Sequence, residues 1–287
     1  MIPLPFALDR NHRIVEDAVF VETVKKPFSA GTAWRLAKKP ASLAARRFLG
    51  TITGVETEQP VLALTFDDGP HPEYTLRLLD ILDRYQAKAT FFCVGKFAVN
   101  HPEVIRQAAE AGHVVGNHTW DHPSFPLLTH NERCVQIREC EKALQPYGSL
   151  LFRPPYGHQS LASRLDLLQM GYQVVGWTLA APDWRLTDPR PIAEEVLPQV
   201  RPGRIIVFHD RIAAALSPIN FNREPMLGVV EQLLQALRHD YRFVTVPELS
   251  RYGRLVRDNW YRRPKTSLLN GLIEEGDLPA RRYPVAV

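Results

Sequence analysis

Cysteine is scarce in this sequence, and its scarcity excludes two kinds of site. The 287 residues contain three cysteines, Cys93, Cys134 and Cys140, and no two of them form a CxxC pair. An odd count without close pairs argues against a disulfide framework and against a zinc site built from thiolates. Cys93 lies inside an apolar run, so we expect it to be a small core side chain.

Long hydrophobic runs are missing as well. No segment approaches the roughly 18 consecutive apolar residues that a membrane-spanning helix requires. The N-terminus lacks the basic start and long apolar stretch of a Sec-type signal peptide, so we expect a cytoplasmic location. A basic, partly amphipathic stretch at residues 34–49 is more typical of an extra structural layer, but it leaves a weak association with a membrane surface open.

Motifs for nucleotides and nucleic acids are absent too. No G-x-G-x-x-G and no phosphate-binding Gly-Lys loop follows the first predicted strand, which disfavours nucleotide binding. The formal net charge of +4 is mildly basic, but the basic residues are scattered and form no recognition motif with aromatic residues. We therefore expect no nucleic-acid partner. The oligomeric state cannot be read from the sequence.

The sequence does contain a regular alternation of strand and helix patterns. Seven short runs are apolar and rich in β-branched or aromatic residues, as is typical of buried parallel strands. Helical patterns lie between most of them, and one begins where Thr129 and Glu132 resemble a capping box. The alternation predicts an α/β protein with a parallel sheet or barrel. The predicted strands are 61–66, 88–93, 113–117, 150–152, 172–178, 204–208 and 242–246, and the predicted helices are 74–85, 103–111, 129–144, 160–170, 192–200 and 226–238.

This alternation also predicts the domain organisation. Residues 59–250 carry the pattern and are expected to form one domain. Residues 1–58 and 251–287 lie outside it, and we predict that they are N- and C-terminal extensions.

Polar side chains interrupt the apolar pattern at one recurring place, the carboxyl end of a predicted strand. In an α/β barrel these ends converge on one rim, where active sites are built. The residues concerned are Asp67 and Asp68 after the first strand, His118 after the third, Arg153 after the fourth, Asp183 shortly after the fifth and His209 after the sixth. Scattered surface residues would show no such preference for one edge.

Two of these residues, Asp68 and His118, predict a metal site together with His122. His118 and His122 are four residues apart, so their imidazoles point the same way if the segment forms a helical turn. Asp68 can add an oxygen ligand, and two histidines with one carboxylate leave coordination positions open for catalysis. Asp67 points elsewhere because side chains alternate along a strand, so it can face a bound water. The alternative is a turn, since Asp-Gly-Pro is a turn signal.

At this point the motifs resemble those of the polysaccharide deacetylase family, also known as the NodB-homology domain or carbohydrate esterase family four. Five family motifs occur in order across residues 60–250. They are TFDDGP at 65–70, HTWDH at 118–122, RPPYG at 153–157, Asp183-Trp184, and VFH at 207–209. Two positions depart from the pattern: Ala180 replaces an earlier aspartate, and Val207 replaces a leucine.

The resemblance implies a distorted (β/α)7 barrel and a role for each motif. It implies a divalent metal on Asp68, His118 and His122, preferably zinc, with cobalt, nickel or manganese left open. Asp67 would be the general base and Arg153 its partner, while His209 would be the general acid supported by Asp183. The backbone N–H of Tyr156 would stabilise the oxyanion, and Trp184 would line the acetyl pocket. Structural alternatives remain: Arg153 could pair with a surface carboxylate, His209 could cap a helix, and Trp184 could be core.

The resemblance leaves several functions open. The leading one is removal of N-acetyl groups from an amino-sugar glycan or oligosaccharide. Alternatives on the same scaffold are a deacylase or deformylase of a small amide or lipid-linked amino sugar, and an O-acetyl esterase. A catalytically silent glycan-binding protein would be expected to have lost Asp67, His209 or a metal ligand, and this sequence retains them all.

Overall fold

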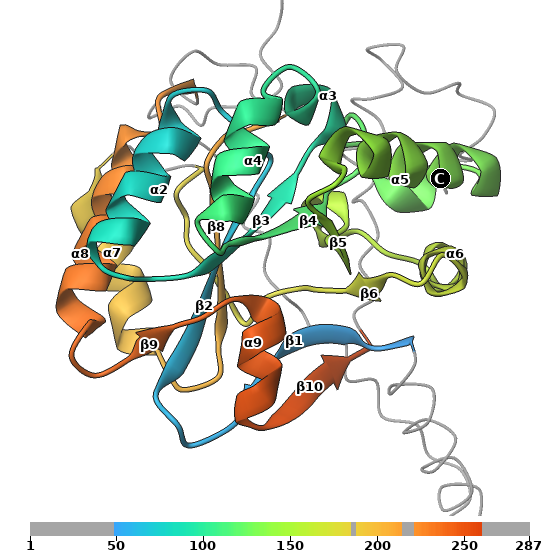
Figure 1. The fold of residues 1–287 in the computed structure, drawn as a ribbon. Helices are drawn as coiled ribbons and strands as arrows, with labels where there is room; N and C mark the ends of the chain where they lie inside the picture. Colours follow the sequence, from blue (N-terminus) through green and yellow to red (C-terminus); the bar gives the residue numbers. More distant parts are fainter. Residues whose placement is uncertain (1–48, 185–187, 214–220, 260–287) are drawn as a thin grey trace, which may run out of the picture. The chain divides into compact units, whose positions relative to one another are not determined.

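The fold is built on a parallel sheet (Figure 1). The computed structural model describes residues 49–184, 188–213 and 221–259. The strands follow the order β6-β5-β4-β3-β2-β8-β7, and β9 pairs with β2. They are β2 (Val61–Asp67), β3 (Ala89–Cys93), β4 (Val114–Asn117), β5 (Gly148–Phe152), β6 (Gln173–Val174), β7 (Leu179–Ala180), β8 (Ile205–His209) and β9 (Arg242–Phe243). This curled parallel sheet confirms the predicted α/β fold of the (β/α)7 type.

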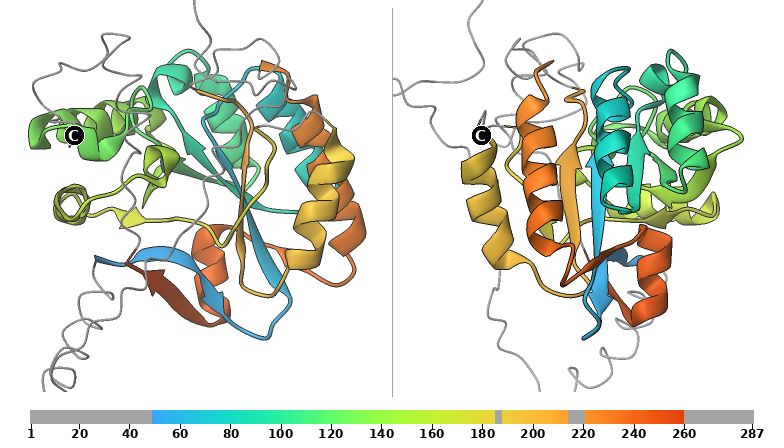
Figure 2. Two further views of the ribbon diagram at one scale, coloured as in Figure 1. Left: turned by 180° about the vertical axis from the view of Figure 1, so that it is seen from behind. Right: turned by 60° about the vertical axis from the view of Figure 1, so that its left-hand side comes forward.

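Helices cover the sheet, and their amphipathic patterns explain why they pack there (Figure 2). Among them, α2 buries the predicted stripe of Leu78, Leu79 and Leu82. The predicted capping box of Thr129 and Glu132 begins α5. The helices are α2 (Tyr74–Arg84), α3 (Gly95–Ala98), α4 (Pro102–Glu110), α5 (His130–Leu144), α6 (Leu161–Gln169), α7 (Pro189–Val196), α8 (Glu224–Leu237) and α9 (Val246–Leu249). None of these described helices is long and apolar enough to cross a bilayer.

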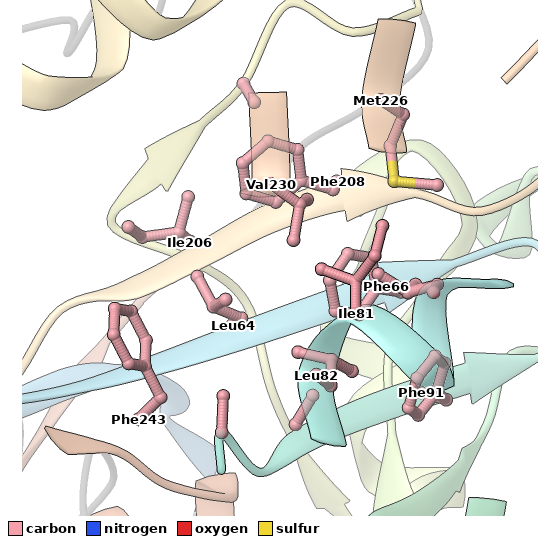
Figure 3. Packing of buried hydrophobic residues seen from close by; sticks show 14 of the residues in the cluster. Leu64, Phe66, Ile81, Leu82, Phe91, Ile206, Phe208, Met226, Val230 and Phe243 are labelled. Carbon is pink, nitrogen blue, oxygen red and sulfur yellow. The ribbon is translucent and has the colours of Figure 1, made fainter. Parts of the chain in front are cut away.

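The main core lies between the central strands and the helices α2 and α8 (Figure 3). Phe66 of β2 stacks between Phe91 of β3 and Phe208 of β8, with ring centroids 5.2 and 5.9 Å apart. Met226 and Val230 of α8 are fully buried in the same cluster. Burial of these side chains fixes the central strands, and therefore the polar residues that follow them.

A second, two-stranded sheet was not predicted. β1 (Thr51–Glu56) pairs antiparallel with β10 (Arg254–Asp258), and both belong to the same compact unit as the parallel sheet. β1 also bridges to Val175 and to Arg204, beside β6 and β8. The predicted domain boundaries at 58/59 and 250/251 stay a prediction, and the amphipathic stretch at 34–49 lies, apart from Leu49, outside the described residues.

Three predicted elements differ from the structure in ways that have a clear physical reason. The strand expected at 172–178 is short, because the chain leaves β5 after Val174, bridges to β1 at Val175 and joins β8 only in β7. The helix expected from residue 192 begins at Pro189, a position where proline suits the first helical turn. The strand expected at 242–246 ends at Phe243, and Thr245 instead caps α9 by accepting a hydrogen bond from the backbone N–H of Glu248.

Candidate active site

The strand register brings the predicted polar residues to one edge of the sheet. Asp67 of β2 lies beside His209 of β8, because the two are aligned partners in the parallel pairing. Asn117 of β4 is aligned in the same way with Phe152 of β5, so His118 and Arg153 leave the sheet together. The predicted convergence at the carboxyl ends of the strands is therefore present.

Asp68, His118 and His122 form the potential metal site. Oδ1 of Asp68 lies 3.2 Å from Nε2 of His118 and 3.1 Å from Nε2 of His122. One ligand atom from each residue lies within 4.8 Å of the others, and all three residues are buried. Two imidazoles and one carboxylate in such proximity are a common donor set for a catalytic zinc ion.

Hydrogen bonds around these residues fit a cation. Nδ1 of His118 lies 2.6 Å from the carbonyl oxygen of Arg153, which can only accept, so Nδ1 carries the proton and Nε2 offers its lone pair. Oδ2 of Asp68 accepts a 2.8 Å hydrogen bond from the backbone N–H of Ala213. Oδ1 of Asp68 is buried and accepts no hydrogen bond from any described residue. An unsatisfied buried carboxylate oxygen between two imidazole nitrogens is what a metal ligand requires.

The charge state of Asp68 also suits a ligand. Burial by itself would raise the pKa of this carboxyl group, but His122, His118 and His209 together hold the pKa well below its usual value. Asp68 is therefore ionised at neutral pH.

Backbone strain is concentrated at the site. Four of the five described non-glycine residues with positive φ belong to it: Asp68 (73°), Thr119 (71°), His122 (67°) and Tyr156 (57°). Such conformations cost about 1–3 kcal/mol each and persist where surrounding contacts impose them. Residues 118–122 do not form the helical turn considered for the four-residue spacing: the segment is an irregular loop, although its two imidazoles do approach each other.

Arg153 is completely buried and holds Asp67. Its Nη1 donates a 2.7 Å hydrogen bond to Oδ1 of Asp67 and a 2.8 Å hydrogen bond to Oγ1 of Thr65. Nη2 donates to the carbonyl oxygen of Gly176 at 2.7 Å, and the guanidinium lies 4.2 Å from the ring centre of Phe92. The other oxygen of Asp67 lies 4.0 Å from Nε2 of His118, so this carboxylate borders the potential metal site.

His209 and Asp183 form a second charged pair. Nδ1 of His209 lies 3.0 Å from Oδ1 of Asp183, and the backbone N–H of His209 donates a 2.9 Å hydrogen bond to Oδ2. Burial lowers the pKa of His209, but Asp183, Asp68 and Asp67 outweigh it and raise the pKa to about 9. The imidazole is therefore protonated at neutral pH.

Sequence reasoning missed Arg223, which contacts this pair directly. Its guanidinium donates hydrogen bonds to Oδ2 of Asp183 and to the carbonyl oxygens of Asp183 and His209. Arg223 precedes α8 and follows no predicted strand, so neither periodicity nor position at a strand end indicates it.

Tyr156 and Trp184 are the more exposed of the predicted site residues. The ring of Tyr156 packs edge-on against His122, with centroids 4.6 Å apart. Partial burial of this side chain and the charge of Asp68 raise the pKa of Tyr156 to about 12. Trp184 follows the buried Asp183 and is 44% exposed. Their assigned roles, like those of the other site residues, stay predictions.

Comparison with known proteins agrees with this architecture. The family described as polysaccharide deacetylase matches residues 54–175. A chitooligosaccharide deacetylase from Azorhizobium caulinodans is 34% identical over 197 residues, which cover 66% of this chain and 94% of that protein. A peptidoglycan-N-acetylglucosamine deacetylase from Bacillus cereus is 32% identical, over 69% of this chain and 92% of that protein.

Solved structures show the same similarity. A crystal structure of a peptidoglycan N-acetylglucosamine deacetylase superposes with a TM-score of 0.65 at 25% identity, covering 79% of this chain and all of that one. The peptidoglycan deacetylase PdaC from Bacillus subtilis gives a TM-score of 0.60 at 32% identity, over 69% of this chain and 93% of that one.

Proposed function

Because the chain belongs to the polysaccharide deacetylase family, we propose that it is a metal-dependent hydrolase that removes N-acetyl groups from an amino-sugar glycan or oligosaccharide. The observation that carries the proposal is the arrangement of two proton-transfer groups beside the buried Asp68-His118-His122 cluster. Asp67 and His209 lie on adjacent strands at this cluster, one with a basic partner and one with an acidic partner. The relatives named above act on chitooligosaccharides and peptidoglycan, which supports an N-acetylated carbohydrate substrate.

The donor set of two imidazoles and one carboxylate favours zinc, and cobalt, nickel or manganese would fit the same residues. When bound, a divalent cation would lower the pKa of a water molecule and polarise the acyl carbonyl. The fixed Nδ1 proton of His118 and the unsatisfied Oδ1 of Asp68 support this assignment.

Asp67 would act as general base. Its carboxylate borders the cluster and pairs with the buried guanidinium of Arg153. Asp67 would accept a proton from the attacking water, so that the oxygen of this water can form a bond to the acetamide carbon. Arg153 also aims the carboxylate, since its remaining donors are fixed by Thr65 and by backbone carbonyls.

His209 would act as general acid. The C–N bond breaks as the sugar nitrogen takes a proton from the imidazolium, which leaves acetate and a free amine. Asp183 holds Nδ1 of His209, so Nε2 is the atom that donates. The backbone N–H of Tyr156 would donate to the developing oxyanion, and Trp184 would line the pocket for the acetyl methyl group.

The alternatives differ in the group that is released. A deformylase or deacylase of a small amide or a lipid-linked amino sugar would use the same residues, as would an O-acetyl esterase. A silent glycan-binding protein is disfavoured because Asp67, His209 and the three potential ligands are all present in one cluster. The expected cytoplasmic location, which favours a precursor or an oligosaccharide as substrate, stays a prediction.

The decisive experiment measures acetate release from N-acetylglucosamine oligomers and from peptidoglycan. Wild type is compared with Asp67→Asn and with the control Asp121→Asn. The carboxylate of Asp121 lies in the same loop as His122, but it is exposed and accepts a hydrogen bond from Gln136 rather than bordering the cluster. Each protein is assayed before and after chelation and again after zinc is returned. Release that requires metal and Asp67, but not Asp121, supports the proposal. Release that survives both chelation and Asp67→Asn would overturn it.

A further inference from the structure

The buried guanidinium of Arg223 contacts His209, the proposed general acid, and its partner Asp183. Arg223 is 2% exposed and lies at the N-cap of α8. Its Nη2 donates to Oδ2 of Asp183 at 2.5 Å, its Nη1 to the carbonyl oxygen of Asp183 at 3.0 Å, and its Nε to the carbonyl oxygen of His209 at 3.1 Å. All three contacts are therefore made to the Asp183–His209 pair.

We propose that Arg223 is the positioning residue for the Asp183–His209 pair, an inference that rests on the proposed function in assigning His209 as the acid. The geometry of the carboxylate carries the argument. Oδ2 of Asp183 accepts from both Arg223 and the backbone N–H of His209, so both of its lone pairs are used. Oδ1 is left for Nδ1 of His209 at 3.0 Å. The guanidinium thus fixes the rotation of the carboxylate and, through it, the direction of the imidazole.

The charge of Arg223 has a second consequence for the acid. The acidic groups that act on His209 are Asp183, Asp67 at the end of β2 and Asp68 directly after it, and all three favour the imidazolium. Arg223 places a positive charge on the far oxygen of Asp183 and so weakens the attraction between this carboxylate and the imidazolium. Without this charge the imidazolium would be held more tightly and would be a poorer proton donor at neutral pH.

The position of Arg223 is fixed by the core. Its carbonyl oxygen accepts a hydrogen bond from the backbone N–H of Leu227 in the first turn of α8. Met226 and Val230 anchor that helix in the main hydrophobic cluster (Figure 3). Arg223 therefore connects the packing of α8 to the orientation of the acid.

The chain provides a matched control in Arg133 of α5. Arg133 is also a buried arginine, 6% exposed, and its Nε donates a 2.6 Å hydrogen bond to Oδ2 of the buried Asp166. Neither residue belongs to the proposed active site. Replacing Arg133 removes an ion pair of the same kind, so these variants measure how much the loss of a buried arginine–aspartate pair lowers stability without touching the proposed active site.

The test compares Arg223→Gln and Arg223→Lys with Arg133→Gln and Arg133→Lys. Deacetylation kinetics give kcat and KM, urea unfolding gives stability, and ¹⁵N NMR of the metal-free protein follows the His209 imidazole, assigned by its loss in His209→Gln. We expect Arg223→Gln to lower kcat about 10- to 100-fold with little change in KM, and to raise the pKa of His209 by about one unit. Arg223→Lys keeps the positive charge but lacks the planar guanidinium with its several fixed donors. The pKa of His209 should therefore equal that of wild type, while kcat should lie between the values of Arg223→Gln and wild type.

Each outcome decides the inference. An unchanged kcat and an unchanged His209 titration in Arg223→Gln would overturn it, and so would an equal loss of kcat in the Arg133 variants. If Arg223→Gln does not fold, Arg223→Lys still separates geometry from charge, because a kcat equal to that of wild type would refute the positioning role. If wild type releases no acetate from any glycan, the proposed function fails, while the NMR titration still tests whether Arg223 controls His209.

Discussion

Nη1 of Arg153 donates a 2.7 Å hydrogen bond to Oδ1 of Asp67, and both side chains are buried where β2 and β5 leave the sheet. A buried ion pair is most costly when only one partner is removed, because the remaining charge has no compensation. The two residues therefore depend on each other for stability as well as for the proposed chemistry.

Arg153→Met is expected to destabilise the protein by about 3–5 kcal/mol, since it leaves the carboxylate of Asp67 uncompensated. Part of this loss should be recovered in Arg153→Met/Asp67→Asn, although neither variant should release acetate. Urea unfolding of the two single variants and the double variant measures the coupling. Arg254→Met, which removes an exposed pair with Glu56, should change the free energy of unfolding by less than about 1 kcal/mol. Strictly additive losses at Arg153 and Asp67 would contradict the expected coupling.

Metal binding should depend on the three clustered ligands. Calorimetric titration of the metal-free protein with zinc is expected to show one site, and His118→Ala, His122→Ala and Asp68→Asn should each weaken or abolish it. At a free zinc concentration of 100 times the dissociation constant, the wild type should gain about 2.7 kcal/mol of stability. His239→Ala removes an exposed histidine and should bind as the wild type does. Equal affinity in wild type and in the three ligand variants would place the metal elsewhere.

The sequence predicted much of the site because parallel strands impose a simple geometry. Asp67, Asp68, His118, Arg153 and His209 each follow an apolar strand, and the carboxyl ends of such strands meet at one edge. Apolar runs in the sequence indicate the buried strands, so the residues that follow each run can be assigned to the edge of the sheet where the carboxyl ends meet. The roles of the residues, in contrast, rest on chemistry and on family resemblance.

What the sequence did not reveal depends on contacts between distant residues. β1 and β10 pair across about two hundred positions, and a strand pattern at residues 51–56 does not indicate its partner. The loop at residues 118–122 is shaped by the side chain of Asn117 and by Gln136 of α5, which accepts from the backbone N–H of Trp120. Arg223 reaches the acid pair only because α8 packs where it does.

The elevated pKa of His209 predicts a specific dependence of stability on pH. The folded protein holds the imidazole proton with a pKa of about 9, against about 6.5 in an unfolded chain. The native state therefore binds more protons between these values, so the stabilisation is complete below pH 6.5 and is lost as pH rises to about 9. The loss is at most roughly 3.4 kcal/mol. Urea unfolding of the metal-free protein should show a fall across this window that is absent in His209→Gln; parallel profiles would contradict the shift.

The same titration should appear in the kinetics. If protonated His209 is the general acid, kcat/KM should fall as pH rises through its pKa. A bound cation repels the imidazolium, so the alkaline limb should lie below the value measured for the metal-free protein. Arg223→Gln should move this limb to higher pH. A pH profile that stays flat up to pH 10 would exclude His209 as the acid.

Gly69 follows Asp68 and packs directly against the carboxylate of Asp210. A Cβ at this position would overlap that carboxylate, lying 2.6 Å from Oδ1. Asp210 cannot move away easily, because it is buried and accepts a hydrogen bond from the hydroxyl of Thr75. Asp210 is 1% exposed, and this burial raises its pKa to about 7.

Gly69→Ala should therefore destabilise the protein by about 1–3 kcal/mol, as overpacking does. It should also weaken zinc binding by about 10-fold, since the overlap displaces the turn that carries Asp68. Thermal unfolding and calorimetry measure the two effects. Asp210→Ala removes the group that the new methyl would meet, so Gly69→Ala should be less costly in the Asp210→Ala background than in the wild type. An equal cost in both backgrounds would show that the backbone of the Asp68 turn, rather than the Asp210 carboxylate, requires glycine at this position.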